Sequence, residues 1–164
     1  MSSQARLSPR AAVVLGSVII ATGLLIILLA VGIVPVDERS LEAPRWVVAC
    51  AGLAFVLGGA AVMIGYAVAG GVGPDGDLPP GTPLSIRIAQ YTLGLGVAGS
   101  MAAIMSWIAF GPGPRTFTAT GPFLGGRATS ETTGRVVFGI GAVLIYVFLA
   151  ALVVVSIKRL RRGK

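Results

Sequence analysis

The sequence predicts an all-α polytopic membrane protein, a bundle of four transmembrane helices with one long extracytoplasmic loop. Of its 164 residues, 55% are apolar and only 12% are charged, whereas soluble domains carry about 25% charged residues. The mean hydropathy is +0.90. The apolar residues gather in segments that each approach or exceed the roughly 20 residues that a spanning helix needs. We therefore expect a single membrane domain over residues 1–164, with spans at about 11–34, 46–72, 84–110 and 136–157.

The first segment is an unbroken apolar run of 24 residues that follows a polar arm with Arg6 and Arg10. A cleaved signal peptide is the alternative, with residues 30–32 as its small-residue cleavage site. We favour a retained span because the run exceeds the 7–15 residues of a signal-peptide core. Small residues recur along it and predict a helix-packing face. They are Ala12, Gly16, Gly23 and Ala30.

The second segment follows a charged loop between Pro35 and Arg45. Pro44 suits the first turn of a helix, and Trp46 suits the membrane interface. The segment carries its own stripe of small residues, which predicts a second packing face. This stripe consists of Ala54, Gly58, Ala61, Gly65 and Ala69. Four prolines within residues 73–83 exclude a helix in the connector that follows.

The third segment, residues 84–110, is predicted to be the hub of the bundle. Its small and polar residues recur every three or four positions and so share one helical face. In lipid, small residues let helix backbones approach closely, which is what drives packing there. The face consists of Ala89, Thr92, Gly96, Gly99, Ala103 and Ser106.

The long loop, residues 111–135, is predicted to lie outside the cell. Its length exceeds what two antiparallel helices need for their connection, which favours a functional or a disordered segment. Alternating residues at 115–120 indicate a small hairpin, with disorder as the open alternative. We expect this loop to contact a partner. The candidate contact residues are Arg115, Phe117, Phe123 and Arg127.

A basic tail, residues 158–164, follows the fourth segment and is predicted to anchor it at anionic lipid on the cytoplasmic side. Its charged residues are Lys158, Arg159, Arg161, Arg162 and Lys164. With four spans, the side that holds both termini carries eight Lys and Arg residues and the other side carries five. The positive-inside rule therefore puts both termini in the cytoplasm. Because the tail directly follows an apolar span, we expect membrane lipid and not nucleic acid as its partner.

The composition disfavours catalysis and metal binding. The chain has no His and one Cys, Cys50, so neither an intramolecular disulfide nor a Cys/His metal cluster can form. No Asp, Glu, Lys, Arg or His lies within 11–34 or 46–72, where a proton-coupled antiporter would need a carboxylate. We expect no catalytic residue, metal or cofactor. For Gln90 we expect a helix–helix hydrogen bond or a place at the membrane interface, one turn from Arg87. For Tyr146 we expect internal packing with a hydroxyl partner, and contact with a lipid or quinone is the alternative.

Two stretches carry a family resemblance. They are residues 35–48, PVDERSLEAPRWVV, and residues 107–117, WIAFGPGPRTF. Both resemble an uncharacterised group of small bacterial four-span integral membrane proteins. The resemblance implies a bacterial cytoplasmic (inner) membrane, brings no activity or site with it, and draws attention to the two outer loops.

The function expected from the sequence is a non-enzymatic membrane protein, an accessory or scaffold subunit whose outer loops contact another membrane protein. The alternative is a small transporter or channel that works as a homo-oligomer.

Overall fold

The computed structural model of the protein describes residues 8–35, 43–71, 78–119 and 127–162. Its helices are α1 (Pro9–Ala30), α2 (Arg45–Val62) with its π-helical continuation η2 (Met63–Val68), α3 (Leu84–Phe110) and α4 (Glu131–Arg162). Four helices in this part of the chain are long and apolar enough to cross a membrane. The predicted number of membrane-length helices is therefore confirmed.

α1 ends at Ala30, four residues before the expected limit, because a glycine turns the chain. Gly32 has φ +79°, a left-handed conformation that glycine adopts without steric cost. Its N–H donates to the oxygen of Leu29 at 3.2 Å, and the N–H of Ile33 donates to the oxygen of Leu28 at 3.0 Å. This pair of bonds is the Schellman arrangement, which satisfies carbonyl groups that a helix end leaves without partners.

α4 begins at Glu131, five residues before the expected span, because Ser130 caps it. The Ser130 Oγ accepts a hydrogen bond from the Thr133 N–H at 3.1 Å, which satisfies one of the free donors of the first turn. The negative charge of Glu131 in that turn also suits the positive end of the helix dipole. α4 then continues to Arg162, so the basic tail prolongs the helix through the described residues.

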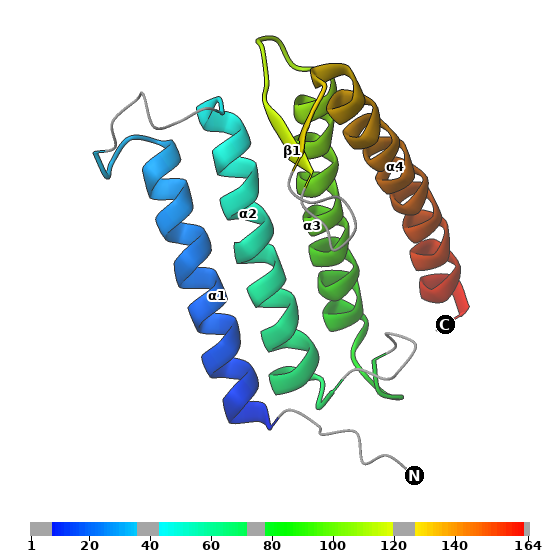
Figure 1. The fold of residues 1–164 in the computed structure, drawn as a ribbon. Coiled ribbons are helices and arrows are strands. Elements are labelled where there is room, and N and C mark those ends of the chain that lie inside the picture. Colours follow the sequence, from blue (N-terminus) through cyan, green and yellow to red (C-terminus); the bar gives the residue numbers. More distant parts are fainter. Residues whose placement is uncertain (1–7, 36–42, 72–77, 120–126, 163–164) are drawn as a thin grey trace.

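Each helix packs against the next helix in the chain: α1 on α2, α2 on α3, and α3 on α4. Figure 1 shows an open bundle in which the four helices stand in chain order, with α1 and α4 at opposite edges. Consecutive helices run antiparallel, so the start of α1 and the end of α4 lie at the same end of the molecule. We call this the terminal end and the opposite one the hairpin end.

The hairpin end is named for two short antiparallel strands between α3 and α4. β1 (Phe117–Ala119) pairs with β2 (Arg127–Thr129), and Phe117 lies opposite Thr129. Of the two alternatives predicted for residues 115–120, a small hairpin or disorder, the hairpin is therefore observed.

The interior is made of small residues, and the large apolar side chains face outward. Among the residues whose exposure is described, the buried apolar ones are Ala12, Ala30, Val47, Ala102, Ala109 and Ala142. Many Val, Leu, Ile and Phe side chains on all four helices are exposed. A soluble protein rarely exposes so large an apolar surface, whereas lipid is a suitable solvent for it.

Candidate functional site

The closest helix contact joins α1 and α2 through two pairs of glycines. A Cβ atom on Gly23 would lie 2.6 Å from the backbone oxygen of Gly52, and one on Gly52 would lie 2.7 Å from that of Gly23. Gly16 and Gly59 are related in the same way, at 2.8 and 2.7 Å. Because no side chain fits at these four positions, the two backbones touch directly, as small residues allow between membrane helices.

The predicted packing faces agree with this contact on α1 and differ from it on α2. The four buried residues of α1 are Ala12, Gly16, Gly23 and Ala30, the face expected from the sequence. On α2 the prediction for Gly58 is wrong, since a Cβ there would meet nothing within 4 Å. The contact glycines are instead Gly52 and Gly59, which repeat the seven-residue spacing of Gly16 and Gly23. Gly65 is buried in η2.

On α3 the single predicted stripe is also corrected. A Cβ on Gly96 would lie 2.5 Å from Cδ1 of Leu57, so this glycine does face α2. A Cβ on Gly99 would meet nothing within 4 Å, and Ala103 is half-buried. The buried residues of α3 are Ser100, Ala102 and Ala109. The reason is that α3 has two neighbours, α2 and α4, so its contacts are divided between two faces.

Two polar side chains within the helices differ in how they are satisfied. The hydroxyl groups of Tyr146 and Ser106 lie 3.1 Å apart and form a hydrogen bond between α4 and α3. The hydroxyl partner expected for Tyr146 is thus Ser106, although the Tyr146 side chain is exposed and not internal. The Oε1 atom of Gln90 is buried and accepts no hydrogen bond from the described residues. The expected helix–helix bond is therefore not made through this oxygen.

Arg115 folds back over the end of α3. Its guanidinium carbon lies 3.8 Å from the centroid of the Trp107 ring, within the range of a cation–π interaction. Its Nη1 group donates to the backbone oxygens of Trp107, at 2.7 Å, and of Ile108. Both carbonyl groups belong to the last turn of α3. The oxygen of Trp107 also accepts the N–H of Gly111 at 2.8 Å, whereas Pro112 has no N–H to offer that of Ile108. Arg115 therefore caps the negative end of the helix dipole.

Arg135, in the second turn of α4, closes the same site from the other side. Its Nη1 group donates to the backbone oxygens of Ala109 at 3.4 Å and Gly111 at 2.9 Å, and Nη2 donates to that of Gly113 at 2.6 Å. Nε and Nη2 both lie 2.9 Å from Oε1 of Glu131. Four hydrogen bonds and one ion pair therefore hold the Arg135 guanidinium between Glu131 and three backbone oxygens.

The electrostatics of this site follow from two cations held close to one carboxylate. Partial burial lowers the pKa of Arg115, the positive charge of Arg135 lowers it further, and the negative charge of Glu131 raises it. An arginine begins from so high a pKa that it stays protonated at physiological pH. The Nη2 atom of Arg115 is buried without a hydrogen-bond acceptor among the described residues. Arg115 and Arg135 therefore act together as a permanently charged clamp on the carbonyl groups at the end of α3.

The hairpin is fixed to α4 by an aromatic contact. The rings of Phe117 and Phe138 are 5.7 Å apart at an interplanar angle of 35°, a favourable tilted arrangement. Phe117 also lies directly on Gly134, where a Cβ would come within 2.2 Å of its ring. The hairpin thus packs where α4 has no side chain.

Of the candidate contact residues, the structure brings Arg115 and Phe117 together at the hairpin end. Arg127 lies in β2, across the ladder from Ala119, and Phe123 lies outside the described residues. Arg135 was not among the residues predicted from the sequence. The Glu131–Arg135 spacing of four residues, which allows an ion pair on a helix, was the available signal. Of the tail, residues 158–162 continue α4, and Lys164 lies outside the described residues.

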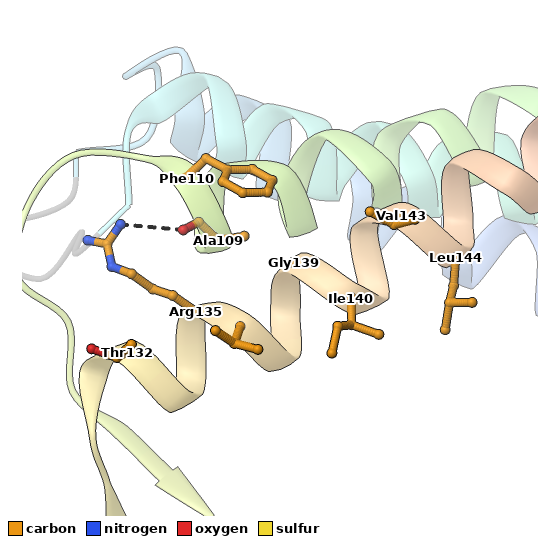
Figure 2. Close-up of a pocket in the computed structure, with 9 residues that line it drawn as sticks. Ala109, Phe110, Thr132, Arg135, Gly139, Ile140, Val143 and Leu144 are labelled. Carbon is orange, nitrogen blue, oxygen red and sulfur yellow. Dashed lines mark hydrogen bonds between the residues drawn. The ribbon is translucent and has the colours of Figure 1, made fainter.

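An open groove of about 520 Å³ lies between α3 and α4 at this end. Ala109 and Phe110 of α3 form one side, and Thr132 and Arg135 form the mouth (Figure 2). The rest of the lining comes from one face of α4: Val136, Gly139, Ile140, Val143 and Leu144. No family model, curated protein or solved structure matches this chain, so the groove and the clamp are interpreted from their chemistry alone.

Proposed function

We propose that this protein is a non-enzymatic subunit of a membrane complex, an accessory or scaffold protein that contacts its partner at the hairpin end. Its place is the cytoplasmic membrane of a bacterium, with both termini in the cytoplasm and the hairpin outside. Eight Lys and Arg residues on the terminal side against five on the other support this orientation.

The observation that carries the proposal is that the described start of the connector, residues 111–119, is held against α3 and α4. Arg115 ties its start to Trp107, Phe117 ties β1 to α4, and Arg135 holds the backbone at residues 111 and 113. A passive connection between antiparallel helices needs only a few residues. Ordering a glycine-rich segment costs conformational entropy. A surface ordered in advance lowers the cost of binding, which suits a docking element.

Exposed residues between these ties offer the contact surface. Pro112, Pro114 and Thr116 are exposed, while their neighbours Gly111 and Arg115 are buried or half-buried. A substitution at Thr116 can therefore alter the surface without removing a contact that holds the connector.

A non-enzymatic role is supported by the residue types of the chain. With no His and a single Cys, it has few of the bases, nucleophiles and soft metal ligands that catalysis uses. The clamp itself uses its charges to cap carbonyl groups, which is a structural task.

The test compares two charge substitutions at opposite ends of α3 and its connector. Thr116→Glu changes the exposed connector, and Ser85→Glu changes an exposed position at the terminal end. Acidic residues have little influence on membrane topology, so orientation should be unaffected in both. The full-length variants are purified in mild detergent, and co-purifying proteins are quantified by mass spectrometry.

The proposal expects a specific partner to be lost with Thr116→Glu and kept with Ser85→Glu, at equal thermal stability. Retention of every partner by Thr116→Glu, and by a variant with 116–129 replaced by a Gly/Ser linker, would rule out the hairpin end. A homo-oligomer that conducts ions in liposomes would support the channel alternative instead.

A further inference from the structure

The groove between α3 and α4 follows a single face of α4. Its α4 residues recur at intervals of three and four positions from Thr132 to Leu144, which places them on one helical stripe. Figure 2 shows Arg135 and Thr132 at one end of the stripe and Leu144 at the other. The twelve-residue separation corresponds to about 18 Å along the helix axis.

The outer side of the groove is open and apolar. The side chain of Phe110 is 72% exposed and that of Leu144 is 63% exposed. Ile140 and Val143 are more than half exposed as well. In a membrane these side chains face hydrocarbon, so the groove opens sideways into the lipid.

The length of the groove distinguishes its possible occupants. One leaflet provides about 15 Å of the roughly 30 Å hydrocarbon core, which is close to the length of the stripe. A transmembrane helix of a partner would run through both leaflets, with about 20 residues in contact. The groove ends at Leu144, although α4 continues for another 18 residues to Arg162. The length of the groove therefore matches one acyl chain better than a transmembrane helix.

The charge at the mouth does not select an anionic headgroup. Arg135 already makes four hydrogen bonds and an ion pair, through Glu131 and three backbone oxygens. The carboxylate of Glu131 also offsets its positive charge. A phosphate would have to displace these contacts, so recognition has to come from the apolar walls.

We propose that this groove binds one acyl chain of a phospholipid from the leaflet at the hairpin end, without preference for its headgroup. This inference goes beyond the proposed function and requires only that α3 and α4 span the membrane. Bound in this way, the lipid would cover the outer edge of the α3–α4 contact beneath the connector.

The first test uses the unmodified protein in liposomes of phosphatidylcholine that carries a photoactivatable group midway along one chain. Cross-linked peptides should concentrate on Phe110 and on the α4 stripe. An even distribution over the exposed apolar residues of all four helices would contradict the proposal.

The second test fills the groove. A Cβ on Gly139 would make an ordinary contact, 3.6 Å from Cζ of Phe110, so a larger side chain would extend into the groove. Gly139→Leu should lower phosphatidylcholine retention in native mass spectrometry by about tenfold. Ala150→Leu, at an exposed α4 position beyond the groove, is the matched control and should retain the lipid.

Two comparisons separate the chain from the headgroup. Retention should increase with acyl-chain length, and phosphatidylcholine and phosphatidylglycerol with equal chains should be retained equally. A strong preference for phosphatidylglycerol, or full retention by a folded Gly139→Leu variant, would overturn the proposal.

Discussion

A Cβ atom on Gly23 would lie 2.6 Å from the backbone oxygen of Gly52, so the α1–α2 contact is made between backbones. The atom in the way belongs to the main chain and cannot rotate aside. A side chain at either position therefore has to push the helices apart, and the loss spreads along the contact that also includes Gly16 and Gly59.

Gly23→Ala should accordingly destabilise the protein by about 1–3 kcal/mol, the usual cost of overpacking. Gly58→Ala is the matched control on α2, since its new methyl group would meet nothing within 4 Å. It should leave stability unchanged or raise it slightly, because alanine favours helix more than glycine does. Thermal unfolding in detergent measures both, and equal effects of the two substitutions would contradict the assigned interface.

Arg135→Gln should loosen the connector at its start. The substitution removes the charge and most of the donors that the oxygens of Ala109, Gly111 and Gly113 use. Hydrogen bonds from charged groups contribute about 1.5–3 kcal/mol, and partial exposure of this site reduces that figure. Limited proteolysis between 111 and 130 should become faster. Arg135→Lys should only partly restore protection, because an ammonium lacks the planar fork that reaches several oxygens at once.

Gly134→Ala should release the hairpin from α4. Its Cβ would come within 2.2 Å of the Phe117 ring, so the ring would have to leave Phe138. We expect a cysteine placed at Thr116, in a Cys50→Ser background, to react faster with a membrane-impermeant maleimide after this change. Gly139→Ala is the control. Its Cβ would lie 3.6 Å or more from every neighbouring atom, so it should not change the rate.

Reporter fusions test the orientation. Fusions after Lys164 and within 73–83 should report cytoplasm, and a fusion at Thr129 should report the outside. Neutralising all five basic residues of the tail leaves three Lys and Arg residues on the terminal side against five on the other. Orientation should then become mixed. A wild-type protein with its C-terminus outside would overturn the assignment.

The helices themselves were accessible from the sequence, because membrane spans leave a strong local signal. Residues 84–110 were predicted at the bounds that α3 has, since prolines and glycines mark both ends. The limits of α1 and α4 were missed by several residues. They depend on a glycine turn at Gly32 and a serine cap at Ser130, which are local features that hydropathy does not register.

The site was only partly predictable. Arg115 and Phe117 were singled out from the composition of the loop. Their partners, Trp107 and Phe138, lie on two different helices, and no periodicity in the sequence pairs them. The same holds for Arg135, whose backbone acceptor oxygens lie more than twenty residues away in the chain.

The sequence by itself determined that this protein has four membrane-length helices and that small residues line one face of α1, because apolar length and residue size are properties of each segment alone. Only the tertiary structure decided which glycines of α2 meet α1, that α3 packs on two faces, and that two arginines close over the end of α3. These relations depend on the rotation and order of neighbouring helices. In lipid, close packing of shapes fixes both, and apolar periodicity gives little guidance because all sides of a helix are compatible with the solvent.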